Sequence, residues 1–246
     1  MSCGVSYEKK LPRLAKGQEE DSGTCWIWIA LASEHRLMLA VVVGPRTQRS
    51  AHHLVDRTAY VLCGKLPLFV SDGLDSYGVA LLDRYHVNVS YPPTGRRGRP
   101  RLPEKQPASD LRYAQVVKKR ERGRVVSVTK RIVYGDDSTI DSKDITTSLV
   151  ERLSLTLRRE NSTLQRKTLS FAKDEDELKA HLSLQVAYYH FVRPHLSLRE
   201  KIDQSPGINA NRKWQKRTPA MSAKITDHVW SLRELLTFRP HITSTN

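Results

Sequence analysis

The chain has few cysteines, no long hydrophobic run and too few acidic residues to balance its basic ones. Its three cysteines, Cys3, Cys25 and Cys63, lie far apart and form no C-x-x-C pair. This argues against a disulfide framework or a zinc ribbon and favours a reducing, cytoplasmic compartment. The apolar segments 25–32 and 37–44 are each too short to cross a bilayer, and residues 1–13 contain no signal-peptide core. We therefore expect a soluble protein with no membrane partner.

The charge balance points to a polyanionic partner. Lysine and arginine number 41 against 26 acidic residues, which gives a formal net charge of +15. Clustered cations bind nucleic acid because they neutralise phosphates and release counterions. A hydrophobic content of 39% over 246 residues is enough for a folded core. Composition alone leaves a ribosomal or other RNA-binding protein open.

The first third of the chain alternates strand-like and helix-like patterns. Residues 26–31 and 37–43 are apolar runs joined by a short polar turn, which predicts a hairpin of buried strands. Residues 47–62 have helical periodicity, 66–70 form a third apolar strand, and 75–85 form a second helix. The order β-β-α-β-α predicts an α/β (α+β) fold in which helices cover one mixed sheet.

A proline-rich basic segment follows. Between residues 91 and 131 there are 13 lysines or arginines and three acids, a local balance of 13 − 3 = +10. The prolines in 91–109 predict an extended basic loop, and strand-like segments at 110–118 and 124–134 flank a turn at Arg122-Gly123. We interpret this region as a nucleic-acid contact surface rather than a solvated loop.

The second half is mainly helical by its pattern. Residues 148–166 and 175–192 are predicted helices, and the second ends before Pro194. Residues 9–22 are charged and polar and predict a loop. The segment from Ser205 onward is basic and only partly patterned, and 243–246 reads as a frayed tail.

Two acidic residues stand where metal chemistry could use them. Asp72 ends the apolar strand 66–70, and Gly73 is predicted to let the backbone turn sharply after it. Glu151 lies in the first turn of the helix that begins near Ser148. Arg158, two helical turns later, shares its face and could hold a phosphate. Mg²⁺ prefers oxygen ligands, so such a pair suits a magnesium site.

Ordinary structural roles are open for both acids. Ser71-Asp72-Gly73 is common turn chemistry. Glu151 fits a capping box with Ser148, in which the Glu151 side chain would cap the N-terminus of the helix.

Five blocks, in order along the chain, resemble DDE transposases of bacterial and archaeal insertion sequences, close to the insertion sequence one group. They comprise 26–31 with 43–47, 70–73 with Tyr77, 147–152 with 157–158 and 166–168, 188–195 with Leu198, and 218–221 with 226–230. The resemblance implies an RNase H-like mixed sheet flanked by helices, an integrase-like catalytic core. It divides the chain into a first-strand remnant with a polar loop (1–24), the catalytic domain (25–200) and a basic C-terminal extension (201–246).

The resemblance also implies chemistry and partners. Asp72 and Glu151 would be two of three catalytic, metal-binding carboxylates around two Mg²⁺ or Mn²⁺ ions, which promote DNA strand cleavage and strand transfer. The DNA of the element ends and of the target would be the partner, and a homo-oligomer is open. The basic residues expected along the DNA are Arg96, Arg97, Arg99, Arg152, Arg158, Arg159, Arg166 and Lys167.

The chain departs from the family pattern in one important respect. The first catalytic acid belongs near Ser2, no Asp stands there, and the N-terminal DNA-recognition region is missing. Two functions follow from the resemblance. One is a transposase catalytic domain, and the other is a truncated, catalytically inactive DNA-binding remnant.

Overall fold

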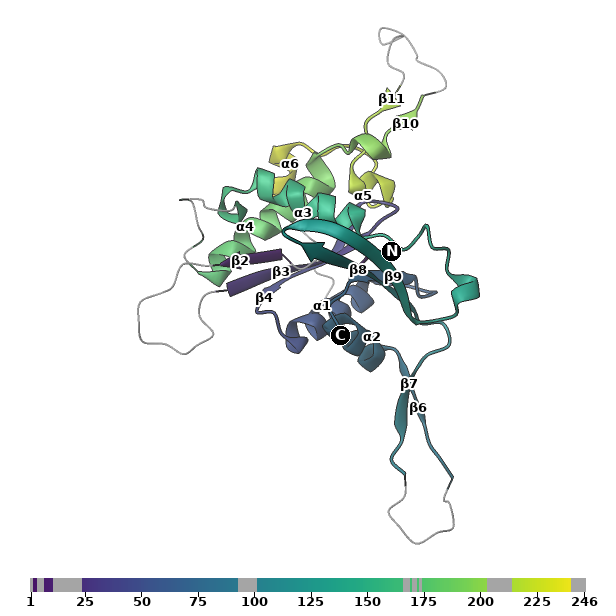
Figure 1. The fold of residues 1–246 in the computed structure, drawn as a ribbon. Helices are drawn as coiled ribbons and strands as arrows, with labels where there is room; N and C mark the ends of the chain where they lie inside the picture. The colour runs from purple at the N-terminus through teal and green to yellow at the C-terminus, as the bar shows by residue number, and fades with distance from the viewer. Residues whose placement is uncertain are drawn as a thin grey trace.

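The computed structural model describes residues 2–3, 7–10, 24–92, 101–165, 169, 172, 174–202 and 214–239. At its centre β3 (Thr24–Ala32) and β4 (Leu37–Gly44) form an antiparallel hairpin, as predicted (Figure 1). Successive β3 side chains pack on opposite faces, because a strand alternates with period two. Trp28 and Ala30 belong to one core cluster, and Ile27 and Ile29 belong to another. The strand is therefore buried on both faces.

Two short strands precede the hairpin. β1 (Ser2–Cys3) and β2 (Tyr7–Lys10) both pair antiparallel with β3, on the side away from β4. The expectation of a loop from residue 9 was wrong at Lys9 and Lys10, which pair with Cys25 and Thr24. β1 also contacts β5 (Leu68–Asp72), so it lies between the hairpin and the rest of the strands.

A second sheet has the order β5-β8-β9. β5 is parallel to β8 (Arg112–Glu121), and β8 is antiparallel to β9 (Arg124–Tyr134). The predicted strands and their turn are confirmed. Arg122 and Gly123 have φ angles of 49° and 80°, the left-handed pair that a two-residue hairpin turn needs to match strand twist.

Helices cover the strands on both sides (Figure 1). α1 (Gln48–Val61) and α2 (Ser76–Arg84) pack on the Trp28 face, where Leu54 and Leu81 are buried. α3 (Ser148–Glu160) and α4 (Glu175–Ala187) pack on the Ile27 face. The result is a mixed α/β arrangement compatible with the predicted α+β class.

The ends of the long helices differ in part from expectation. α3 ends at Glu160 rather than near residue 166, and a 3₁₀ turn, η2 (Ser162–Leu164), follows it. The helix predicted over 175–192 is confirmed, but its last five residues form a π-helix, η3 (Tyr188–Val192). Two further 3₁₀ turns are η1 (Asp137–Thr139) and η4 (Leu196–Leu198).

Two side chains form hydrogen bonds with the backbone at the outer edge of β4. Among the described strands β4 pairs only with β3. On its other side the Met38 N–H donates to His190 Nε2 at 3.0 Å, and Arg57 donates to the Val41 carbonyl at 3.2 Å. These bonds join α1 and η3 to the strand edge.

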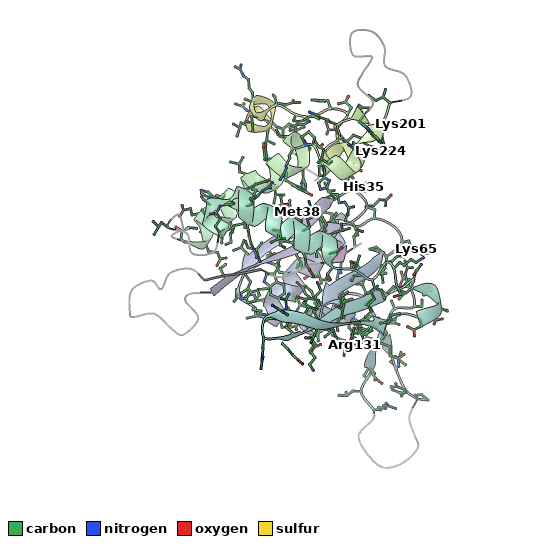
Figure 2. The ribbon with its side chains drawn as sticks, turned by 45° about the horizontal axis from the view of Figure 1, so that its top comes forward. His35, Met38, Lys65, Arg131, Lys201 and Lys224 are labelled. Atoms are coloured by element: carbon green, nitrogen blue, oxygen red, sulfur yellow. The ribbon has the colours of Figure 1, made fainter. Side chains whose placement is uncertain are left out.

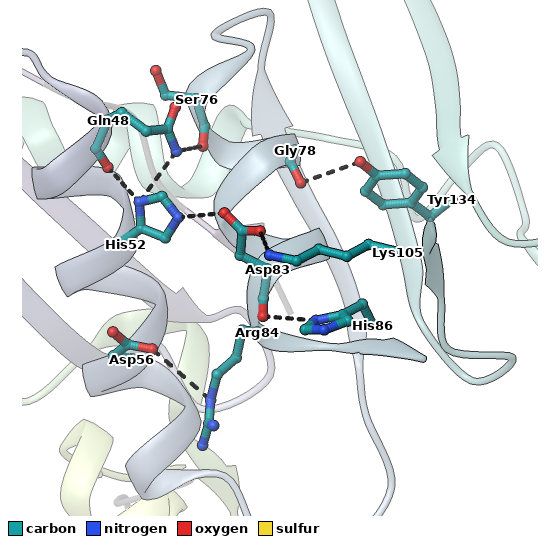
Figure 3. A network of polar contacts seen from close by, with 10 residues as sticks. All are labelled: Gln48, His52, Asp56, Ser76, Gly78, Asp83, Arg84, His86, Lys105 and Tyr134. Atoms are coloured by element: carbon teal, nitrogen blue, oxygen red, sulfur yellow. Dashed lines mark hydrogen bonds and ion pairs between the residues drawn. The ribbon is translucent and has the colours of Figure 1, made fainter. Parts of the chain in front are cut away.

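The basic segment contains a hairpin where its prolines predicted a loop. β6 (His86–Val89) pairs antiparallel with β7 (Glu104–Pro107), so the prediction of an extended loop over 91–109 was wrong for residues 104–107. Asp83 links this hairpin to the helices: it accepts hydrogen bonds from His52 at 2.8 Å and from Lys105 at 2.6 Å (Figure 3).

The C-terminal part of the described chain packs against the π-helix. It contains β10 (Glu200–Lys201), β11 (Trp214–Gln215), α5 (Pro219–Ser222) and α6 (Leu232–Thr237). The Trp230 ring lies 4.4 Å from that of Phe191, and the Trp230 N–H donates to the Phe191 carbonyl. His35, which Figure 2 labels, lies in the β3–β4 turn and bonds Ser222 at 3.1 Å.

No helix in the described part of the chain is long and apolar enough to cross a membrane.

Candidate functional site

Asp72 is the last residue of β5, and its register partner on β8 is Val116. The glycine that follows it has a role other than the one predicted. Gly73 does not adopt a positive φ, but a Cβ at this position would lie 3.3 Å from Val117 Cγ2. The residue is therefore glycine because β8 approaches closely, and not because the backbone turns through the left-handed region.

The Asp72 carboxylate is largely buried at the strand end. The Leu74 N–H donates to its Oδ1 at 3.3 Å, which is the local turn bond that an Asp-Gly sequence favours. Burial raises the pKa of Asp72, and the nearby charge of Glu151 raises it further. The Leu74 N–H, Arg46 and Lys118 oppose this rise. The charge of Glu151 is therefore close enough to influence the protonation of Asp72.

Glu151 lies in the first turn of α3. Thr147 Oγ1 donates to its Oε1 at 2.7 Å, and Lys118 Nζ makes an ion pair with the same oxygen. Burial raises the pKa of Glu151, but the bonds from Lys118 and Thr147 outweigh it, so that the net shift is downward. The alternative of a capping box was wrong, because the N-cap residue is Thr147 and its side chain makes no capping hydrogen bond.

Asp72 and Glu151 line one cleft of about 760 Å³. Four cationic side chains also line it: Arg46, Lys118, Arg120 and Arg158. With Asp75 as the third acid, the lining carries 4 − 3 = +1. Arg46 lies 4.7 Å above the centre of the Trp26 ring, so a cation–π contact holds it beside the acids.

Three of these four cations were not among the binding residues predicted from the sequence. Lys118 and Arg120 lie two residues apart on β8, so they share a face of the strand. That spacing was visible in the sequence, but their approach to Glu151 depends on β8 lying parallel to β5. Arg46 lay within a motif of the resemblance without being assigned a role.

The predicted basic residues go to different places. Arg158 lines the cleft with Glu151, as its two-turn spacing predicted. Arg152 lines a separate cavity on the other flank of α3, and Arg159 lines neither but pairs with Glu160 at the surface. The remaining five, Arg96, Arg97, Arg99, Arg166 and Lys167, lie outside the described residues.

The donor set of the cleft fits one hard cation. Asp72 and Glu151 offer carboxylate oxygens, the ligands that Mg²⁺ and Mn²⁺ favour. Within the described ranges, however, no group of three or more His, Cys, Asp or Glu side chains could hold a metal ion. The two-metal site that the resemblance implies stays a prediction. A cation between Asp72 and Glu151 would also have to replace the Lys118 ammonium.

Comparisons of the chain with protein-family models, with curated proteins and with solved structures found no match. The interpretation of the cleft therefore depends on its geometry and on the sequence motifs. The geometry provides two carboxylates in one cleft that four cationic side chains also line.

Proposed function

We propose that this chain is a DNA-binding domain of the DDE transposase class, and that its cleft acts on phosphodiester bonds in DNA strand cleavage and transfer. One observation carries the proposal. Asp72 and Glu151 are 151 − 72 = 79 residues apart in the chain, yet they meet in a single cleft lined by four cations. A site for a phosphate and a divalent cation needs both kinds of group in the same place.

The order of the elements supports an RNase H-like core. β4, β3 and β1 lie side by side, β1 contacts β5, and β5 pairs parallel with β8. One helix follows the hairpin, a second follows β5, and a third comes after β9. These sheets, with helices on both sides, are compatible with the fold that the resemblance implies, and Asp72 lies at a strand end and Glu151 on a helix.

The acids and the arginines of the cleft would have different roles. Asp72 and Glu151 would hold Mg²⁺ or Mn²⁺, which when bound stabilises negative charge on the attacking and leaving oxygens. Arg158 and Arg120 would bind the phosphate and fix the DNA strand across the cleft. Since burial raises the pKa of Asp72, the ionised form that binds a cation is lost at a higher pH than for an exposed aspartate.

The test is strand cleavage by the intact chain in Mg²⁺ or Mn²⁺, measured as nicking of supercoiled DNA. We expect cleavage by the wild type and a loss of about a hundredfold or more in Asp72→Asn and Glu151→Gln, since each removes a charged ligand. Asp110→Asn is the matched control, because Asp110 is exposed and lines neither cavity. Equal cleavage by all four proteins would exclude this role for the cleft.

One observation favours a second candidate, DNA binding without cleavage. Lys118 already makes an ion pair with Glu151, and no group of three His, Cys, Asp or Glu side chains in the described part of the chain could hold a metal ion. This function predicts no cation-dependent nicking by any variant. It also predicts binding that weakens steeply with salt and weakens further in Arg158→Gln. Binding that is insensitive to salt and to Arg158 would contradict both candidates.

A further inference from the structure

A second cavity, of about 280 Å³, lies on the opposite flank of α3. Four of its lining residues carry cationic or imidazole side chains: Arg36, Arg152, Arg193 and His195. They come from three parts of the chain, namely the β3–β4 turn, α3 and the segment after η3. The sequence motifs included Arg152, Arg193 and His195 but did not bring them together with Arg36.

The cavity has an excess of positive charge and no acid in its lining. Arg193 makes an ion pair with Glu160, which lies outside the lining. Within the described chain no ion pair joins Arg36 or Arg152 to an acid. Counting three guanidinium groups and Glu160 gives 3 − 1 = +2, because the pKa of His195 is lowered and its imidazole is neutral at pH 7.

Arg36 combines an unusual backbone conformation with a buried side-chain nitrogen. Its φ angle is 55°, in the left-handed region that turns usually fill with glycine or asparagine. Its Nη1 atom is buried and has no hydrogen-bond partner among the described residues. Its Nε donates a long bond of 3.4 Å to Ser197 Oγ. A buried guanidinium N–H without an acceptor is costly and points to an acceptor that the chain does not supply.

The surroundings of His195 show the same repulsion between cations. Burial lowers the pKa of His195, and the charges of Arg36, Arg193 and Arg152 lower it further. The imidazole accepts from the Ser197 N–H and lies edge-on to Tyr189, whose ring centre is 6.4 Å away. An anion in the cavity would offset the positive charge that lowers the pKa of His195.

We propose that this cavity binds a terminal phosphate, the dianionic end group of a nucleic-acid strand. A terminal phosphate carries about −1.5 to −2 charges at pH 7, which matches the net +2, whereas a backbone phosphodiester carries one. Guanidinium groups donate paired N–H bonds that fit phosphate oxygens. A water molecule takes roughly 30 Å³ of liquid volume, so the cavity also has room for the atoms that carry the phosphate.

That the phosphate belongs to a DNA strand rests on the proposed function. The cavity's affinity for phosphate follows from its own residues. α3 separates it from the cleft of Asp72 and Glu151, so each can be altered without changing the other's lining.

The experiment compares three oligonucleotides of one sequence by fluorescence anisotropy: with a 5′-phosphate, with a 3′-phosphate and with neither. We expect the wild type to bind at least one phosphorylated form about tenfold more tightly, the effect of one charge-assisted bond. Arg152→Gln, at an exposed position, should abolish that preference, and Arg36→Gln should do the same. Arg49→Gln, an equal charge change at an exposed site on α1, should keep it.

A second arm replaces DNA with inorganic phosphate and follows thermal unfolding. Phosphate should raise the Tm of the wild type and of Arg49→Gln more than that of Arg152→Gln. If the unmodified oligonucleotide binds but terminal phosphates add nothing, the second site is overturned and DNA binding stands. If no DNA binds but phosphate still protects through Arg152, the proposed function fails and the site stands. Equal behaviour of wild type and Arg152→Gln in both arms overturns the site.

Discussion

The two flanks of α3 differ in the charged side chains that line them. On one flank, Asp72 and Glu151 form an acidic pair with cations around it. On the other, Arg36, Arg152 and Arg193 form a cationic group without an acid in the lining. One helix thus separates a cleft lined by both acids and cations from a cavity whose charged lining is cationic.

The difference shows how a helix distributes neighbouring residues. Glu151 and Arg152 are adjacent in sequence but about 100° apart around the helix, so they face different cavities. Leu155 and Arg158 follow Glu151 at spacings of four and seven, and Thr156 follows Arg152 at four. A charge count along the sequence adds Glu151 and Arg152 together. A charge count for each face of the helix keeps them apart.

The sharpest test of this comparison is to change the sign of one flank. Lys118→Glu places a third carboxylate beside Asp72 and Glu151. We expect Mn²⁺ affinity, measured by calorimetry, to rise about tenfold or more, because ligand charge sets the affinity of oxygen sites. Arg152→Glu, the same charge change on the other flank, should leave Mn²⁺ affinity as in the wild type. An equal gain in both variants would mean that net charge, and not the cleft, binds the ion.

A second prediction concerns the support of the cationic flank. His190→Ala removes the acceptor of the Met38 N–H, and we expect the free energy of unfolding to fall by about 1–3 kcal/mol, the cost of a buried donor without a partner. Urea unfolding measures it. His190→Gln keeps an acceptor and should lose less. If the two substitutions lose equal stability, the hydrogen bond is not the cause.

The same histidine predicts a pH dependence. Burial lowers the pKa of His190 to about 4, from an ordinary value of 6.5. Between these values the unfolded chain binds a proton that the folded chain does not. Stability should therefore fall as pH drops from 6.5 towards 4 and should lose this contribution fully below that range. Urea midpoints across this range should show a shallower slope in His190→Gln than in the wild type.

A third prediction concerns the floor of the acidic cleft. Gly73→Ala brings a methyl group to 3.3 Å from Val117 Cγ2, and we expect a loss of about 1 kcal/mol from crowding. Val117→Ala should remove most of that penalty when the two are combined, which a double-mutant cycle in urea measures. Additive losses would show that the close approach of β8 does not require the glycine.

The smallest expected effects are on protonation, and they have opposite signs on the two flanks. Glu151→Gln removes a like charge and should lower the pKa of Asp72. Arg152→Gln should raise the pKa of His195 for the same reason. Nuclear magnetic resonance titration of the two side chains measures both. A shift of His195 in Glu151→Gln, or of Asp72 in Arg152→Gln, as large as the shift on the same flank would contradict the separation by α3.

Much of the fold was predictable because its signals are local. The hairpin of β3 and β4, the helix α1 and the strand β5 each follow from apolar periodicity within a short window. A strand remnant was expected within 1–24 from the resemblance, but the charged pattern from Lys9 onward indicated a loop, and β2 extends to Lys10. β7 was missed because it ends in Pro107, although an outer strand can accommodate proline.

The site was predictable only in part, for a related reason. Asp72 and Glu151 were found from their positions at element ends, and Arg158 from helical spacing. The ion pair of Lys118 with Glu151 depends on how β8 packs beside α3, which no local pattern encodes. Arg36 was invisible because its role arises from a left-handed turn that places it opposite α3. Local sequence patterns do not predict contacts between distant segments of the chain.

The bonds along the outer edge of β4 have a consequence for how the molecule behaves at high concentration. A strand with unpaired backbone groups is a template on which other chains add and polymerise. In this protein His190 and Arg57 use two of those groups, one donor and one acceptor. Because these groups are already bonded, they cannot pair with a strand of another chain. A variant that loses both side chains would expose a nearly continuous apolar strand to other copies of the protein.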